Sequence, residues 1–404
     1  MIAFYATSGT VLVNILNLRM NQLSIEPADL YIMHLYRIPA DLIEISKNSG
    51  LFTNVIVMDN PSAKCHVPTP KYKYSFVNYM IQAPFHLINK TREKIHYFNL
   101  LNKISKKTVY NAIVSYGLGH NALFIIRRFY KYNPNIKIYI IDEGSATIYS
   151  DLDRLCNPLD TLVDLFEKVH FCLLWFFLTG HRCISDAEKY RGHITDCYMY
   201  TPKISKLYSD EKSIEFHELR SINSLNSVRS LLLPLTKKID VSEYNKRQFF
   251  VLANLDGTST HPSHPVFLNL VRVLSSVITY DQIIIKSHPA FPIDDEYYDN
   301  IFPEVYVDNR KDQLETIYLD IDLNKKVLIS IASTAMLYPK YIFDQEPYII
   351  FTYKIYPNVK ITAFELAQLN LLASDLKSSY VNKNKIFIPE SLSEFKSILI
   401  NHLS

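Results

Sequence analysis

Short apolar runs rich in β-branched residues alternate along the chain with segments whose apolar residues recur at helical spacing. This alternation is typical of parallel sheets that carry helices on both faces. The predicted strands are Ile2–Ala6, Leu30–His34, Asn54–Met58, Ala112–Ser115, Ile136–Ile141, Phe249–Ala253, Gln282–Lys286, Val327–Ile331 and Tyr348–Phe351. The predicted helices include Leu12–Leu23, Pro39–Ser49, Asn121–Tyr132, Pro265–Ser276, Leu314–Asp320 and Ser391–His402.

The pattern is interrupted near Leu231–Asn245, where Pro234 precedes a polar stretch. We therefore predict two Rossmann-like α/β domains, 1–235 and 246–404, whose parallel sheets face a central cleft. The last helix is left open: it belongs to the second domain or crosses back to the first.

Composition narrows the class of protein. Of the 404 residues, 48% are hydrophobic and 21% are charged, as in soluble globular proteins. A net charge of +3 is too weak for a dedicated nucleic-acid binder. Only eight glycines are present, which argues against a glycine-rich phosphate loop. The five cysteines include no CxxC pair, so we expect no metal site and no disulfide scaffold, as in a reducing cytoplasm.

Two features bear on membranes. We expect no signal peptide and no spanning helix, because no basic start precedes an unbroken apolar core. The eight-residue run Phe171–Leu178 is either a buried helix or an interfacial patch that contacts lipid. Residues 87–131 hold nine basic residues against one acidic residue. They form either a solvated face or a surface that attracts an anionic glycan or the inner membrane.

Three polar motifs follow predicted strands, at the edge where parallel sheets bind ligands. The first is Asp142-Glu143-Gly144. Two adjacent carboxylates repel each other, and partial burial raises the pKa of one of them, which suits a general base. The alternative is a turn with solvated acids before Gly144.

The second motif is His288-Pro289, where the proline keeps the histidine out of helical geometry. Such an imidazole can donate a proton or a hydrogen bond to a phosphate; the alternative is a core or capping histidine. The third is Ser333-Thr334, two hydroxyls that open a helix-like stretch and can bind an anion. The alternative there is plain N-capping.

Two further segments also follow predicted strands. Ser8 lies in Thr7–Thr10, and Gly257 lies in Asn254–Thr258. Thr7–Thr10 is a candidate to contact the donor or acceptor, and the alternative is a simple turn that begins a helix. Asn254–Thr258 is a candidate donor-binding loop. A base in one domain, and an acid with an anion cradle in the other, is the layout of a transferase that closes over a nucleotide-activated donor.

These motifs, in this order, resemble those of bacterial sialyltransferases of glycosyltransferase family 52, which act on lipooligosaccharide, and family 38, which act on capsule. Those families carry an acidic-acidic-Gly motif, a His-Pro motif and a downstream Ser/Thr pair. The resemblance covers roughly Ile2 to Phe351 and implies the GT-B fold. Relatives often have several consecutive serines where this chain has Ala332 before Ser333.

The resemblance implies inverting, metal-independent transfer of sialic acid from CMP-sialic acid, with no cofactor. Glu143 would be the base that deprotonates the acceptor hydroxyl, with Asp142 beside it. His288 would protonate or hydrogen-bond the leaving phosphate. Ser333 and Thr334 would bind that phosphate, and Glu315 would bind the ribose.

The resemblance also implies an oligosaccharide or glycolipid acceptor, within a surface glycan built in the cytoplasm at the inner membrane. Two alternatives stay open. One is a GT-B transferase that uses a UDP-hexose, and the other is a non-catalytic glycan-assembly protein of the same fold. The sugar linkage and the oligomeric state are not determined by these residues.

Overall fold

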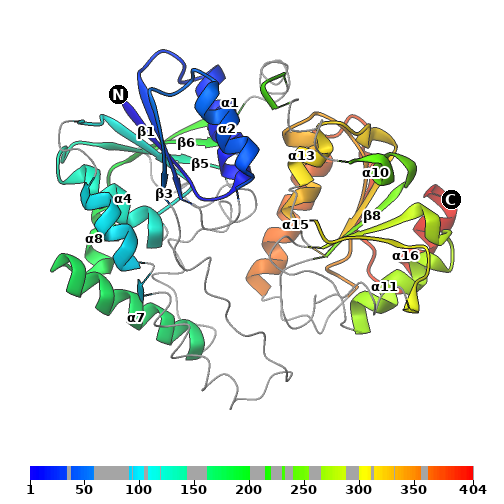
Figure 1. Ribbon diagram of the computed structural model, residues 1–404. Helices are drawn as coiled ribbons and strands as arrows, with labels where there is room; N and C mark the ends of the chain where they lie inside the picture. The colour runs from blue at the N-terminus through cyan, green and yellow to red at the C-terminus, as the bar shows by residue number, and fades with distance from the viewer. Residues whose placement is uncertain are drawn as a thin grey trace. The chain divides into compact units, whose positions relative to one another are not determined.

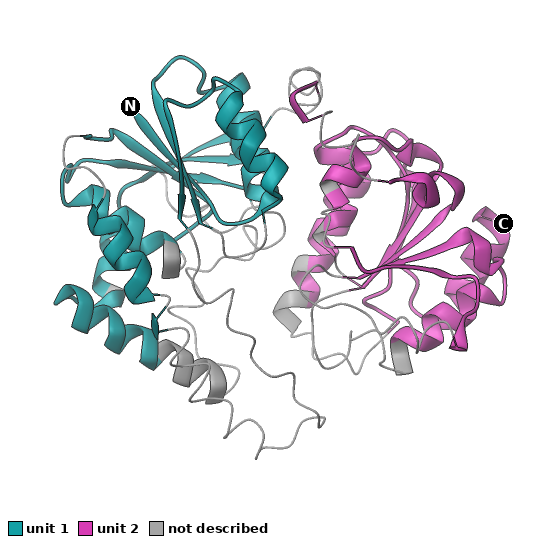
Figure 2. Ribbon diagram, viewed as in Figure 1, with its two compact units in different colours: residues 1–219 teal, residues 220–404 magenta. Residues whose placement is uncertain are grey.

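The structure is a computed structural model in two compact units, Met1–Leu219 and Arg220–Ser404 (Figure 2). By this division the predicted domain boundary near 231–245 lies in unit 2. The structure describes residues 1–33, 38–58, 91–92, 94–103, 108–118, 120–142, 162–200, 214–219, 230–232, 240–253, 265–287, 300–310, 314–331, 333–355 and 363–403.

Unit 1 is built on a seven-stranded sheet whose described pairings are all parallel, in the order β3-β2-β1-β4-β5-β6-β7 (Figure 1). Its strands are β1 Ile2–Ala6, β2 Ala28–Met33, β3 Asn54–Met58, β4 Ala112–Ser115, β5 Lys137–Ile141, β6 Ile194–Met199 and β7 Glu215–Glu218. The helices given for this unit are α1 Gly9–Asn21, α2 Ala40–Asn48, α4 His120–Tyr130, α7 Leu162–Thr179 and α8 Cys183–Arg191. Every residue of central strand β1 is buried, which explains its unbroken apolar sequence.

Unit 2 repeats this architecture with six parallel strands in the order β10-β9-β8-β11-β12-β13. Its strands are β8 Phe249–Leu252, β9 Ile283–Lys286, β10 Tyr306–Asp308, β11 Val327–Ser330, β12 Tyr348–Phe351 and β13 Ile386–Phe387. Its helices are α10 Ser242–Lys246, α11 Pro265–Ser275, α13 Leu314–Tyr318, α14 Tyr338–Tyr341, α15 Ala363–Ser379 and α16 Leu392–Ile398, with η6 Leu399–Leu403 after α16. Helix α16 contacts α11 of the same unit.

The predicted fold class, two Rossmann-like domains with parallel sheets, is confirmed. The nine predicted strands are present, with ends that differ by one or two residues where they are described. Four further strands, β6, β7, β10 and β13, were not predicted. The edge strand β7 has the sequence EFHE and two exposed glutamates, so it lacks the apolar run of a buried strand. Strands β10 and β13 have only three and two residues.

Both sheets have a topological switch point, where the strand order reverses. In unit 1 it lies between β1 and β4, and in unit 2 it lies between β8 and β11. In sheets of this kind ligands bind outside the carboxyl ends of the strands at the switch point. The residues that follow β1, β4, β8 and β11 are therefore the first place to look for a site.

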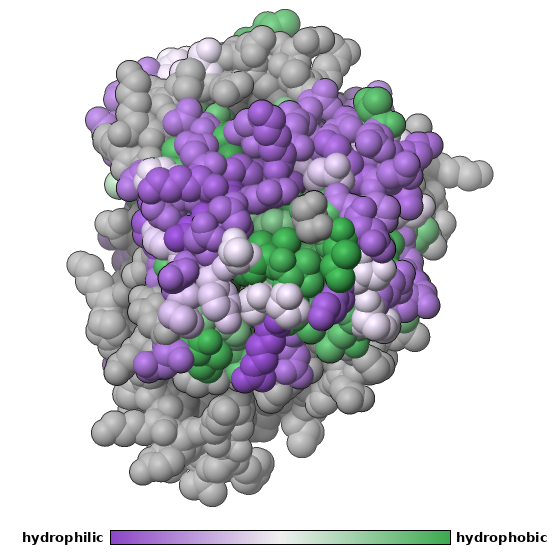
Figure 3. Space-filling view, turned by 90° about the vertical axis from the view of Figure 1, so that its right-hand side faces the viewer, coloured by the Kyte–Doolittle hydropathy of each residue, from purple (hydrophilic) through white to green (hydrophobic). Residues whose placement is uncertain are grey.

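Three further observations concern the helices and the surface. No helix within the described residues is long and apolar enough to cross a membrane. Figure 3 shows the face of unit 2 that lies on the right of Figure 1, where hydrophilic residues surround a smaller apolar area. The run Phe171–Leu178 belongs to the 18-residue helix α7, which packs on α4 through ring contacts of Phe124 with Phe171 and Trp175.

Candidate functional site

Ser8 lies two residues after the end of β1, at the switch point of unit 1. Its side-chain oxygen accepts a hydrogen bond from the backbone N–H of Val11 at 3.2 Å, so Ser8 is the N-cap of α1. The serine is half-buried, and Thr7 beside it is buried. Ser8 therefore caps helix α1, and a contact of Ser8 with a ligand would be in addition to this role.

Asp142 follows β5 and is buried. Its Oδ2 accepts a hydrogen bond from the backbone N–H of Tyr200 at 3.2 Å. Its backbone oxygen accepts a second bond from Asn14 Nδ2 at 2.7 Å. The Tyr200 hydroxyl in turn donates to Asn14 Oδ1 at 2.8 Å. Asn14 on α1 thus ties together the ends of β5 and β6. Asp142 is part of this framework, whereas Glu143 and Gly144 lie outside the described residues.

The polar network around Asn14 is closed to water. Tyr200 is buried, and burial raises its pKa well above the usual value, so the phenol stays a neutral donor. A buried amide between two partners of fixed geometry holds the strand ends in register. The network therefore fixes Asp142, the last described residue after β5.

Tyr200→Phe is expected to lower the free energy of unfolding by about 1–3 kcal/mol, because Asn14 Oδ1 loses its phenolic donor in a buried place. Tyr380→Phe is the matched control, since Tyr380 is also buried and its hydroxyl has no hydrogen-bond partner in the described structure. Urea denaturation of both variants measures the difference. Equal midpoints for the two variants would show that the Asn14 network adds no stability.

Ser330 and Ser333 stand at the switch point of unit 2. Ser330 Oγ donates to the backbone oxygen of Leu252 at 3.1 Å, which joins the ends of β11 and β8. Ser333 donates its N–H to Ser330 Oγ at 3.3 Å, and its own Oγ accepts from the N–H of Ala335 at 3.3 Å. The Ser333 side chain is half-buried. The predicted hydroxyl pair thus begins directly beyond the switch point.

The helix predicted after the hydroxyl pair is shorter than its sequence indicates. Thr334–Met336 form a 3₁₀ turn, η4, and the short helix α14 follows with Pro339 in its first turn. A proline is tolerated there, whereas farther inside a helix it removes a hydrogen bond and clashes with the preceding turn. The Thr334 side chain lies outside the described residues.

A buried charge cluster lies at the ends of β9 and β10, beside β8. Arg310 donates two hydrogen bonds to the carboxylate of Asp308, from Nε at 3.0 Å and from Nη2 at 3.1 Å. Tyr244 donates its hydroxyl to Asp308 Oδ2 at 2.5 Å. Lys286 Nζ lies 3.9 Å from the same oxygen and donates to the backbone oxygen of Arg310. Lys286 and Asp308 are both almost fully buried.

This cluster holds the chain that leads to His288. Burial alone raises the pKa of Asp308, but hydrogen bonds from Arg310 and the charge of Lys286 outweigh burial and leave the pKa lowered. Ser287 donates both its N–H, at 3.0 Å, and its Oγ, at 3.1 Å, to the backbone oxygen of Asp308. Ser287 is the last described residue before His288. It is held by its own two hydrogen bonds and by the burial of its neighbour Lys286.

The remaining predicted site residues are only partly placed. Glu315 lies in the helix α13, but its side chain is outside the described residues. His288, Pro289 and Gly257 are outside them altogether. The sequence reasoning missed Asn14, Tyr200, Lys286, Asp308 and Arg310. One signal was available: a lysine that ends an apolar strand, as in IIIK, needs a buried acid nearby.

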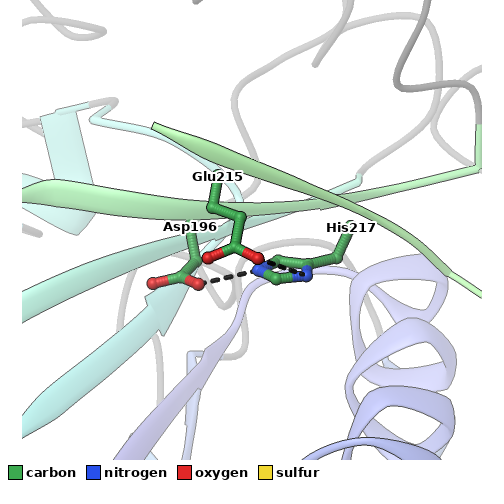
Figure 4. Close-up of side chains that lie close together, drawn as sticks. All are labelled: Asp196, Glu215 and His217. Atoms are coloured by element: carbon green, nitrogen blue, oxygen red, sulfur yellow. Dashed lines mark hydrogen bonds and ion pairs between the residues drawn. The ribbon is translucent and has the colours of Figure 1, made fainter. Parts of the chain in front are cut away.

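A group of possible metal ligands lies elsewhere, on β6 and β7. Figure 4 shows Asp196, Glu215 and His217, whose ligand atoms all lie within 4.8 Å of one another. His217 Nε2 is 2.8 Å from Asp196 Oδ1, while its Nδ1 is 3.9 Å from Glu215 Oε1. The His217 ring also stacks on Tyr198. The histidine–aspartate hydrogen bond accounts for this arrangement, so we assign no metal to it.

No family model matches the chain, and no curated protein matches it. Among solved structures, it is similar to a protein assigned as a UDP-N-acetylglucosamine 2-epimerase from Listeria monocytogenes, with 9% identity and a TM-score of 0.50, over 95% of this chain and 89% of that one. A second UDP-N-acetylglucosamine 2-epimerase gives 6% identity and a TM-score of 0.51, over 100% of this chain and 87% of that one. At such low identity the likeness shows the fold alone, and that fold is GT-B.

Proposed function

We propose that the chain is a GT-B glycosyltransferase that takes its sugar from a nucleotide-sugar donor. The observation that carries the proposal is the place of Ser333, whose turn stands at the switch point of unit 2. A nucleotide bound there would meet the hydroxyls of Ser333 and Thr334 with its phosphates. Glu315, Gly257 and Ser8 remain candidates for further contacts with the donor.

The reaction needs a base for the acceptor alcohol and a donor to the leaving phosphate. In the proposal Glu143 is the base, and His288 protonates or hydrogen-bonds the phosphate. Asp142 has a positioning role, because its carboxylate is committed to the N–H of Tyr200. Gly144 and Pro289 are further candidates for contacts with the donor.

Two donors are candidates. A UDP-hexose is supported by the comparisons, since the two proteins of similar fold are named for a UDP-sugar. CMP-sialic acid is supported by the order of the acidic, His-Pro and Ser-Thr motifs, which resembles that of sialyltransferases. The acceptor in either case would be an oligosaccharide or glycolipid of a bacterial surface glycan.

A cytoplasmic place for the reaction is part of the same proposal. The five cysteines of the chain include no CxxC pair, a usage that fits a reducing compartment. Nucleotide sugars that are consumed there would reach the enzyme without crossing a membrane.

Incubation with CMP-sialic acid and with a panel of UDP-hexoses tests the donor, with nucleotide and sugar both followed by mass spectrometry. Release of CMP supports the sialyltransferase, and release of UDP supports the hexosyltransferase. A changed sugar that stays attached to UDP would indicate an epimerase instead. No turnover of any donor, with lactose-type and sialylated acceptors present, would favour the non-catalytic alternative.

A further inference from the structure

The helix α7 presents an unusual second apolar face. One face carries the buried residues Phe171, Leu174 and Trp175, and Trp175 donates its ring N–H to Asp186 of α8 at 2.9 Å. This face packs α7 onto α4 and α8, which lie beside it in Figure 1. The helix is therefore anchored to unit 1 without using its other side.

The other side is apolar as well. Four large side chains stand out from it, and we name them the α7 stripe. They are Val169 with 47% of its surface exposed, Leu173 with 54%, Phe176 with 53% and Phe177 with 79%. Residues that are four, seven and eight positions apart share one face of a helix. The segment from Val169 to Thr179 contains no acidic residue, lysine or arginine.

A single exposed apolar residue is ordinary on a protein surface, but a continuous stripe of them marks a contact site. The described structure offers single residues for comparison. Ile25 is 96% exposed and Val381 is 91% exposed, and neither has a strongly exposed large apolar neighbour in the chain. The α7 stripe differs from them because its members form one surface with two phenylalanines.

Cationic side chains flank both ends of the stripe. At the start, His170 Nε2 lies 2.8 Å from Thr91 Oγ1, and Arg92 follows as an exposed residue. At the end, Arg127 Nη2 donates to the backbone oxygen of Thr179 at 3.2 Å, and Arg182 is exposed just beyond. An apolar face with basic residues beside it is the pattern of helices that lie in the surface of an anionic bilayer.

We propose that the α7 stripe docks unit 1 on an anionic lipid surface, with α7 in the plane of the interface. Phe176 and Phe177 would enter the boundary between headgroups and acyl chains, and Arg92, Arg127 and Arg182 would meet lipid phosphates. A second copy of the chain fits less well, because two antiparallel stripes would bring their basic ends together. The proposal is independent of the chemistry of the switch points.

Co-sedimentation with vesicles tests the docking. The full chain is expected to pellet with vesicles of phosphatidylcholine and phosphatidylglycerol, and at least about tenfold less with phosphatidylcholine alone. The double variant Phe176→Ser/Phe177→Ser is expected to lose anionic-vesicle binding by about tenfold or more, because it removes the apolar contacts. Arg182→Glu, which alters an exposed residue only, is expected to weaken binding severalfold and to lower its salt dependence.

The matched control is Ile25→Ser/Val381→Ser, which removes two exposed apolar residues outside the stripe and should bind like the wild type. Circular dichroism melting checks that each variant is folded. The proposal would be overturned if the double phenylalanine variant and Arg182→Glu bound anionic vesicles as strongly as the wild type. It would also be overturned if the wild type did not bind anionic vesicles. A change from dimer to monomer in the double variant, measured by light scattering, would assign the stripe to a second copy instead and also overturn it.

Discussion

Asp308→Asn is expected to lower the free energy of unfolding by about 3–5 kcal/mol, the usual cost of removing one partner from a buried ion pair. The substitution keeps the size of the side chain and removes only its charge. Lys286 then remains buried without a counter-charge, and the paired hydrogen bonds from Arg310 are weakened. Urea denaturation, followed by circular dichroism, measures the loss.

Asp320→Asn is the control for this prediction, because Asp320 is an exposed aspartate of the same unit. Its effect should stay within about 0.5 kcal/mol. The pH dependence gives a second check. The Asp308 pKa lies below its unfolded value of 3.8, so its stabilisation is present above pH 3.8 and disappears as the pH falls through the folded-state pKa. The gap between wild type and Asp308→Asn should therefore narrow in acid, and a gap that widens would contradict the assigned cluster.

Glu143→Gln is expected to reduce turnover by about 10²–10⁴-fold, the range for loss of a general base, while the melting temperature stays near that of the wild type. The amide cannot accept the proton of the acceptor alcohol. His288→Ala should show a loss in the same range, because the leaving phosphate loses its donor. Steady-state rates with the donor that the panel identifies measure both effects.

Asp142→Asn is the informative partner of Glu143→Gln, because the two acids are adjacent in the chain and differ in the roles proposed for them. Asp142 is buried and accepts a hydrogen bond from the N–H of Tyr200, so its substitution should mainly lower the free energy of unfolding rather than turnover. A normal melting temperature with lost turnover for Asp142→Asn, together with full activity for Glu143→Gln, would reverse the assignment.

The sequence predicted those parts of the fold in which local pattern and burial agree. Strand β1 is apolar throughout because helices cover both faces of a central parallel strand. Ser8 and Ser333 could be found because each lies within three residues of the end of such a strand. Strand β7 was missed because its sequence, EFHE, holds only one apolar residue, and β10 was missed because three residues are too few to show a pattern.

The supporting residues could not be predicted, because their partners are far apart in the chain. Asn14 meets Asp142 only when α1 lies across the end of β5, and Lys286 meets Asp308 only through the β9–β10 register. The sequence left two interpretations of the run Phe171–Leu178, a core helix and an interfacial patch. Within α7, Trp175 is buried and Phe177 is exposed, so this short run contributes to two faces of one longer helix.

The central claim is that a donor nucleotide binds at the switch point of unit 2, and isothermal titration with CMP and UDP tests it most directly. The full chain is expected to bind one of the two, and Ser333→Ala to bind it about 10- to 100-fold more weakly, because a hydrogen bond to a charged phosphate is lost. Ser391→Ala, which removes the cap of α16 in the same unit, should bind like the wild type. A wild type that binds neither nucleotide, or a Ser333→Ala variant with unchanged affinity, would contradict the account.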